Sequence, residues 1–212
     1  MSLTGLQVKD LFIKLNEVMA KNKEYLTTLD ATIGDGDHGL NLDKGFTAVV
    51  DKIKDEDGSN IGDMLKKVGM ALVSNVGGAS GPLYGTAFMK AAVDVNGKSE
   101  VDLKDFRNML QSALEGIKMR GKAELDDKTM VDSIEPALNQ LKKSIDEGDN
   151  AVDALFKVKE AAYNGVEHTK TIIAKKGRAS YLGDRSIGHQ DPGATSSALI
   201  LDTIYEYVKS QT

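Results

Sequence analysis

The sequence contains no cysteine and no tryptophan, and it has few prolines and few aromatic side chains. Without cysteine, the chain can form no disulfide, no thiolate metal site and no thiol nucleophile. Aromatic residues make up only 5% of the 212 residues. We therefore expect a core built mainly from aliphatic side chains.

Long apolar runs and an excess of positive charge are also absent. No run approaches the roughly 18 residues of a membrane span, and Met1–Asp10 lacks the basic and apolar regions of a signal peptide. The 27 Lys and Arg face 32 Asp and Glu, which leaves a net charge of −5. Nucleic acids and anionic membranes attract basic surfaces. We therefore expect no nucleic acid and no membrane as partners, and a cytoplasmic location.

Apolar residues recur with a helical period along nearly the whole chain, as in Val8, Leu11, Phe12 and Leu15. No β-branched run alternates with a period of two, so no strand is predicted. The pattern predicts an all-α fold and a single domain over residues 1–212. Its eight helices are expected at about 5–27, 38–54, 60–75, 81–95, 102–121, 131–147, 150–174 and 192–210.

The prolines are placed where helices should begin. Pro82, Pro136 and Pro192 each follow a capping residue, as first-turn prolines do. Pro82 and Pro192 also lie in glycine-rich segments, since four of the 21 glycines fall in each of the ranges 34–45, 77–85 and 177–193. Helix initiation alone does not require this clustering of glycines.

Three aspartates, Asp30, Asp35 and Asp37, lie close together before the helix expected at 38–54. Carboxylates this near one another repel unless a cation neutralises them, and Mg²⁺ and Ca²⁺ prefer oxygen ligands. The spacing therefore indicates a divalent metal site. A solvated Asp-Gly turn in which Asp37 caps the next helix explains the same residues equally well.

Two familiar loops are excluded here. Gly34, Gly36 and Gly39 match the G-x-G-x-x-G spacing of dinucleotide-binding loops. However, no predicted strand precedes them, and the enclosed aspartates would repel a pyrophosphate. An EF-hand loop needs an oxygen ligand where this chain has Gly39, and it needs a closing glutamate that the chain lacks.

Two further segments favour anion binding. In 76–85, small residues precede Pro82, so free N–H groups at a helix start could approach a phosphate. A plain tight turn capped by Ser80 or Gly81 is the alternative, and it is the stronger one for this segment alone. The long loop 175–191 offers Arg178, Arg185 and His189 to an anion, and its apolar residues Tyr181, Leu182 and Ile187 favour an ordered loop over a floppy one.

Together, these three segments predict a nucleoside diphosphate or triphosphate site with Mg²⁺, and phosphoryl transfer as the reaction. The same segments resemble the ADP-binding L subunits of bacterial dihydroxyacetone kinases. The resemblance rests on six strings in the expected order: Ile33–Gly39, Val76–Leu83, Arg120–Glu124, Asp127–Met130, Lys176–Gly183 and Ser186–Ala194.

This resemblance implies an eight-helix antiparallel barrel with the nucleotide at one open end. It implies that Asp30, Asp35 and Asp37 hold two Mg²⁺ ions that bridge the nucleotide phosphates, and that Leu83 packs with Met130 against the adenine. The implied nucleotide contacts are His38, Gly39, Leu40, Asn41, Ala79, Ser80, Gly121, Met130, Arg178, Asp191, Pro192 and Gly193.

The resemblance also implies a modular kinase of the phosphotransferase system. Bound ADP becomes ATP transiently when a phosphohistidine subunit phosphorylates it, and the phosphoryl group moves to dihydroxyacetone on a separate substrate-binding subunit. No general base is expected in this chain, and its length leaves no room for a second substrate domain. A transcriptional regulator and a homodimer are further partners that the resemblance leaves open, as are two other functions: a kinase using free ATP on another acceptor, and a nucleotide-binding regulator.

Overall fold

The computed structural model describes residues 2–212. Within that range the chain forms eight α-helices, one 3₁₀ helix (η1) and two short strands. In order, these elements are β1 (Ser2–Thr4), α1 (Gly5–Ile33), α2 (His38–Ile53), α3 (Ile61–Asn75), α4 (Ser80–Asp94), β2 (Glu100–Asp102), α5 (Leu103–Gly121), α6 (Val131–Asp146), α7 (Ala151–Thr169), η1 (Arg178–Ser186) and α8 (Pro192–Ser210).

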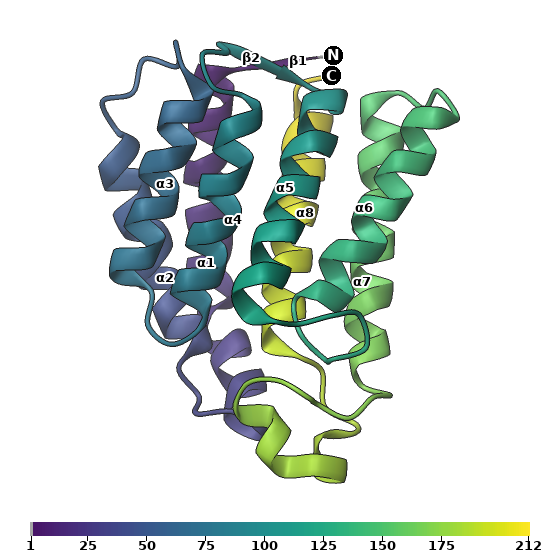
Figure 1. Ribbon diagram of the computed structural model, residues 1–212. Helices are drawn as coiled ribbons and strands as arrows, with labels where there is room; N and C mark the ends of the chain where they lie inside the picture. Colours follow the sequence, from purple (N-terminus) through teal and green to yellow (C-terminus); the bar gives the residue numbers. More distant parts are fainter. Residues whose placement is uncertain (1) are drawn as a thin grey trace.

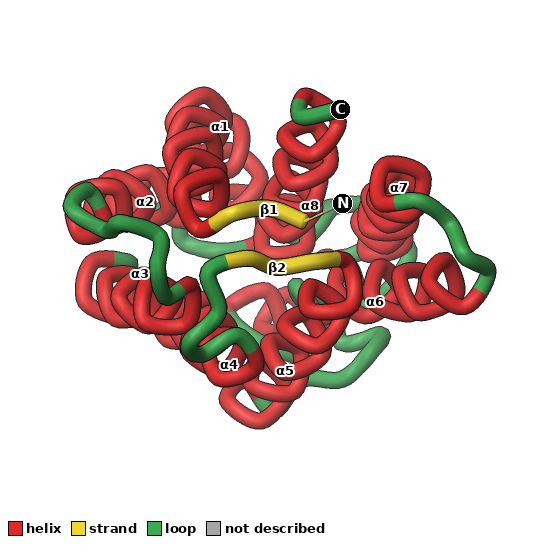
Figure 2. Tube along the Cα trace, turned by 90° about the horizontal axis from the view of Figure 1, so that it is seen from above, coloured by secondary structure: helices red, strands yellow, loops and turns green. Residues whose placement is uncertain are grey.

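The eight α-helices form a closed ring in chain order. Each helix packs against the next one, and α8 packs back against α1. Figure 1 shows the helices side by side, and Figure 2 shows them from above, arranged around a shared interior. The all-α fold class and the expected eight-helix barrel are confirmed. No helix within residues 2–212 is long and apolar enough to cross a membrane.

Aliphatic side chains dominate the interior, as the scarcity of aromatic residues predicts. The largest completely buried apolar side chains include Leu15, Met19, Leu26, Leu42 and Phe46. They recur at helical spacing on α1 and α2, so each helix turns one apolar face inward. Burying these faces against one another is the main force that holds the barrel together.

The prediction of no strand is wrong at one point. Strands β1 and β2 pair antiparallel with Leu3 opposite Val101, and they cross the end of the barrel where both termini lie (Figures 1 and 2). Each strand is three residues long, which is too short to show a period of two. This pair closes one end of the barrel and leaves the other end to the loops discussed below.

Two helix ends differ from the sequence-based boundaries. Helix α1 continues to Ile33 rather than to residue 27, so Asp30 lies in its last turn. Helix α7 ends at Thr169 rather than at residue 174. Both differences occur at the open end of the barrel, where contacts with distant loops decide how far each helix continues.

We expected Pro136 to lie at the start of a helix, but it lies inside α6. The helix begins earlier, at Val131, because the Asp132 carboxylate accepts hydrogen bonds from the N–H groups of Asp126 and Thr129 and so organises the start of the helix. Proline has no N–H to bond the carbonyl of Asp132, four residues earlier. Helix α7 approaches this same carbonyl so closely that a Cβ on Gly165 would lie 2.0 Å from it.

Candidate functional site

A cavity of about 550 Å³ opens at the end of the barrel away from the strands. Its walls come from five parts of the chain: the end of α1 with the turn before α2, the start of α4 with the residues before it, the end of α5 with the α5–α6 loop, the start of η1 with the residues before it, and the start of α8. Most of the sequence-predicted site residues line this cavity, namely Asp30, Asp35, Asp37, His38, Ala79, Ser80, Gly121, Met130, Arg178, Asp191, Pro192 and Gly193.

Three predicted residues, Gly39, Leu40 and Asn41, are not among the cavity-lining residues. A Cβ on Gly39 would lie 2.0 Å from the carbonyl oxygen of Lys23, so this glycine lets α2 pack closely on α1. Leu40 is 53% exposed. The Asn41 amide lies 2.9 Å from where a Cβ on Gly77 would be. In this structure the Asn41 side chain therefore packs closely against Gly77.

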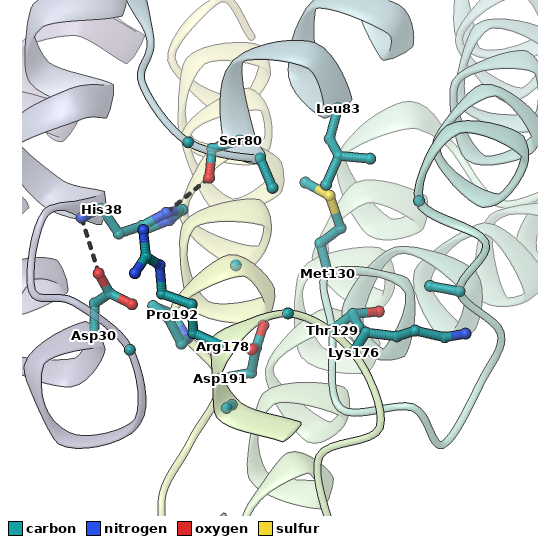
Figure 3. Close-up of a pocket in the computed structure, with 18 of the residues that line it drawn as sticks. Asp30, His38, Ser80, Leu83, Thr129, Met130, Lys176, Arg178, Asp191 and Pro192 are labelled. Carbon is teal, nitrogen blue, oxygen red and sulfur yellow. Dashed lines mark hydrogen bonds between the residues drawn. The ribbon is translucent and has the colours of Figure 1, made fainter. Parts of the chain in front are cut away.

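The three aspartates converge at one edge of the cavity. A carboxylate oxygen from each of Asp30, Asp35 and Asp37 lies within 4.8 Å of the other two. Asp30 projects from the last turn of α1 and accepts hydrogen bonds from the N–H groups of Asp37 (2.9 Å) and His38 (3.2 Å), the second of which is drawn in Figure 3. These bonds fold the turn back over the helix end and bring the carboxylates together.

The donor set at this edge fits a hard divalent cation. All three side chains offer carboxylate oxygens, which Mg²⁺ and Ca²⁺ prefer. Asp37 occupies the N-cap position of α2, but its carboxylate makes no capping hydrogen bond. Its oxygens therefore remain free for a ligand, which favours the metal site over the capping alternative.

Arg178 forms an ion pair with this cluster. Its guanidinium donates to Asp35 Oδ2 at 2.8 Å, and its side chain is 67% exposed. An exposed pair of this kind contributes little free energy, roughly 0–1 kcal/mol. The Arg178 side chain can therefore exchange Asp35 for an anion in the cavity at small cost.

The start of α4 lines the same cavity through Ser80, Pro82 and Leu83. The helix begins at Ser80, and its N-cap, Ala79, offers no side chain to the first turn, so the expected cap at Ser80 or Gly81 is wrong. The N–H groups of Ser80 and Gly81 lie in the first turn, where no intrahelical acceptor exists. Gly78 has a φ of +65° and open space around it. This geometry suits a phosphate.

An apolar wall lies on the other side of the cavity. Figure 3 shows Leu83 from α4 and Met130 from the α5–α6 loop pointing toward each other. A Cβ on Gly121 would lie 3.1 Å from Leu83 Cδ2. Glycine at this position therefore leaves room for Leu83 in the apolar wall.

The loop 175–191 is ordered, as expected, but not for the expected reason. Tyr181 is 87% exposed and Ile187 is 46% exposed. Of the three apolar residues only Leu182 packs, against a small cluster that includes Ile33. Polar contacts hold the rest: the Ser186 hydroxyl accepts from the N–H of Ala174 at 2.9 Å. Arg185 and His189 do not line the cavity.

Sequence reasoning missed Lys128. This lysine is 1% exposed, and its backbone has a φ of +60°, which non-glycine residues rarely adopt. Its ammonium group donates to the backbone carbonyls of three distant residues, Thr169, Ile172 and His189. Lys128 lines the cavity, and it ties its own loop to the end of α7 and to the residues on both sides of η1.

Asp191 is the most strongly perturbed acid in the cavity wall. It is 9% exposed, and it caps α8 by accepting the N–H of Ala194 at 2.7 Å. Burial raises the pKa of its carboxyl to about 7, against the opposing effects of that hydrogen bond and of Lys128. Asp191 therefore changes charge near neutral pH, beside the positions expected to contact a nucleotide.

The raised pKa of Asp191 predicts a pH-dependent stability. The native state keeps this proton up to about pH 7, whereas the unfolded chain loses it near pH 4. The protonated Asp191 therefore stabilises the native state at low pH. This stabilisation is lost as pH rises toward 7, and the free energy of unfolding falls by about 1.4 kcal/mol per pH unit between pH 5 and 7. Asp191→Asn should remove this slope. Urea unfolding of both nucleotide-free proteins from pH 5 to 8 measures it, and parallel curves would contradict the prediction.

Comparison with known proteins identifies the family. Residues 32–206 match the DAK2 domain. The chain is 42% identical over 204 residues to the protein from Escherichia coli K12 named as the ADP-binding subunit DhaL of a PEP-dependent dihydroxyacetone kinase. That match covers 96% of this chain and 97% of the relative. The DhaL subunit of a PTS-dependent dihydroxyacetone kinase from Lactococcus lactis is 43% identical over 195 residues, covering 92% and 93% of the two chains.

A solved structure shares the fold. The dihydroxyacetone kinase of C. freundii, in complex with AMP-PNP and Mg²⁺, matches with a TM-score of 0.71 at 23% identity. The match covers 97% of this chain but only 34% of that longer one. The near-complete, two-way match is therefore to the separate DhaL subunits. This chain belongs to the DAK2-domain family and, within it, to the DhaL type.

Proposed function

We propose that this chain is the ADP-binding subunit of a phosphoenolpyruvate-dependent dihydroxyacetone kinase and that it acts in the cytoplasm. The observation that carries the proposal is the cavity itself: three converging carboxylates lie at its edge, and an uncapped helix start forms part of its wall. Carboxylates alone repel a polyphosphate, and free N–H groups alone do not explain the carboxylates. A Mg²⁺–nucleotide complex satisfies both.

Each group has a distinct role in this proposal. Asp30, Asp35 and Asp37 hold two Mg²⁺ ions, which neutralise the phosphate charge when bound. The N–H groups at the start of α4 bind phosphate oxygens, and Arg178 leaves Asp35 to join them. These groups supply positioning and charge stabilisation, which is most of what phosphoryl transfer requires of a protein.

The apolar wall takes the adenine. Leu83, Met130 and Gly121 line this side of the cavity, and Gly121 leaves room beside Leu83. Methionine and leucine side chains adapt to a planar ring and gain dispersion contacts with it. Figure 3 shows Asp191 and Pro192 between Met130 and Asp30, and His38 and Gly193 also line the cavity; the ribose and the phosphates would contact these residues.

Two further subunits complete the proposed reaction. A phosphohistidine subunit of the phosphotransferase system donates to the bound nucleotide, and a second subunit presents dihydroxyacetone. This chain then needs no general base of its own, because the acceptor hydroxyl lies on the partner. The near-complete match to separate DhaL subunits supports this division of labour. Contact with a transcriptional regulator and a homodimer are secondary parts of the proposal, and mass measurement in solution tests the dimer.

One experiment tests the function directly. The purified chain should retain ADP and Mg²⁺, released on denaturation and measured by chromatography and metal analysis. With both partner subunits and phosphoenolpyruvate it should phosphorylate dihydroxyacetone without free ATP. Rapid exchange of the bound ADP for free ATP, with turnover driven by ATP alone, would favour the free-ATP kinase. A folded chain that binds no ADP when Mg²⁺ and ADP are added would reject the proposal.

A further inference from the structure

A chain of hydrogen bonds leads from the candidate site into the barrel interior. His38 Nδ1 lies 3.0 Å from Ser80 Oγ, the contact drawn in Figure 3, and Nε2 lies 2.9 Å from Ser196 Oγ on α8. Ser196 Oγ is 2.6 Å from the Tyr84 hydroxyl, which is 3.0 Å from Ser197 Oγ. Sequence analysis identified only His38 and Ser80 among these five residues.

The inner end of this series of hydrogen bonds is shielded from water. Tyr84 is 3% exposed, Ser196 is 0% and Ser197 is 2%. Buried polar groups are almost always hydrogen-bonded, because an unmade bond costs about 1–3 kcal/mol. The proton in each of these hydrogen bonds must therefore come from one of the five side chains themselves and not from water.

The carbonyl oxygen of Gly193 fixes where the protons lie in these hydrogen bonds, because it can only accept. Ser196 Oγ also lies 3.1 Å from the carbonyl oxygen of Gly193. A carbonyl cannot donate, so that contact uses the single hydroxyl proton of Ser196. The Tyr84 hydroxyl is 3.5 Å from the same carbonyl, at the limit for a hydrogen bond, and does not compete.

The remaining contacts then have only one solution. With its own proton used, Ser196 must accept from His38 Nε2–H and from Tyr84. Tyr84 accepts from Ser197. His38 Nδ1 carries no proton and accepts the hydroxyl proton of Ser80. Five protons satisfy five contacts, provided that the imidazole is neutral. His38 is only 7% exposed, and both of its ring nitrogens meet neutral hydroxyl groups, so the contacts require only one ring proton.

We propose that Ser196 is a positioning residue that holds His38 as its Nε2–H tautomer and thereby makes Ser80 Oγ a hydrogen-bond acceptor toward the nucleotide site. The Ser80 proton points at His38, so its oxygen offers the cavity only lone pairs. A nucleotide polyphosphate also offers only acceptors. Ser80 Oγ therefore interacts with the cation or with water bound to it, while the phosphate oxygens accept hydrogen bonds from the backbone N–H groups. This inference rests on the proposed function for the identity of the ligand, but not for the tautomer.

Imidazole ¹⁵N NMR of the nucleotide-free protein tests the tautomer. The double variant His168→Gln/His189→Gln leaves His38 as the only histidine, which assigns its signals. We expect the Nε2–H tautomer at pH 7.5. Ser196→Ala should shift His38 toward the Nδ1–H form, whereas the matched control Tyr84→Phe should not, because Ser196 still accepts from Nε2. An Nδ1–H or doubly protonated ring in the unmutated background would overturn the proposal, even if Ser196→Ala failed to fold.

Calorimetric ADP titration of Ser80→Ala, with Mg²⁺ and separately with EDTA, tests the acceptor role. We expect a roughly 2- to 10-fold loss of affinity with Mg²⁺, as for one hydrogen bond, and no loss with EDTA. Equal losses under both conditions would show that Ser80 donates to phosphate, and no loss under either would show no contact; both results overturn the proposal. If the unmutated chain binds no ADP at all, the proposed function fails while the tautomer result stands.

Discussion

Replacing Asp35 and Asp37 together by asparagine is expected to lower the phosphoryl-transfer rate of the reconstituted kinase by about 10³-fold or more. Their carboxylates converge with Asp30 at the cavity edge, and asparagine keeps the shape of each side chain but removes its charge. A bound divalent cation contributes several kcal/mol of charge stabilisation, and each 1.4 kcal/mol corresponds to about tenfold in rate. Metal content and retained ADP should fall with the rate.

A matched pair of carboxylates serves as the control. Asp51 lies near the far end of α2, and its side chain is 77% exposed. Asp51→Asn combined with Asp55→Asn removes the same net charge from the chain but leaves the cavity unchanged. This control should keep its ADP, its Mg²⁺ and its rate. Normal activity and metal content in the Asp35/Asp37 variant would show that the metal is bound elsewhere.

We expect Lys128→Met to cause the largest loss of stability among single substitutions at the site. Methionine fills a similar volume but leaves the carbonyls of Thr169, Ile172 and His189 without their buried donor. Hydrogen bonds to charged groups are worth roughly 1.5–3 kcal/mol each, and lost bonds of one group are not additive. We therefore expect a decrease of about 2–4 kcal/mol in the free energy of unfolding, measured by urea denaturation.

Amide hydrogen exchange can show which segments Lys128 stabilises. Exchange should accelerate in three segments, 126–130, 170–177 and 187–191, because the ammonium group joins all three. Lys122→Met is the control, since Lys122 belongs to the same loop, also has a positive φ and is exposed. Uniform acceleration across the barrel, or none in 170–177, would show that Lys128 does not hold these segments together.

Local pattern predicted much of this protein. Apolar spacing predicted the number and order of the long helices, since each helix buries one face and an apolar residue recurs on that face every three or four residues. The three glycine-containing segments predicted the parts of the site, because turns, carboxylate clusters and helix starts are each made within a few neighbouring residues. Asp35, predicted as a metal ligand, and Arg178, predicted as a nucleotide contact, both line the cavity.

Other features depend on residues far apart in the chain. His38 and Ser196 are 158 residues apart, and Lys128 and Thr169 are 41 apart. Such contacts leave no periodic signal, so nothing local distinguishes Ser196 or Lys128 from other serines and lysines. The end of α7 at Thr169 was missed for the same reason, whereas the strands β1 and β2 are too short to show a period of two.

The sequence by itself therefore determined the helices and the chemical character of the site, whereas the tertiary structure decided how its groups are held. Asp30 illustrates the difference. Its charge and its spacing from Asp35 are visible in the sequence. Only the folded chain shows that it lies in the last turn of α1 and gathers the N–H groups of Asp37 and His38. Burial and proton placement depend on every neighbour in space, and only closure of the barrel brings those neighbours together.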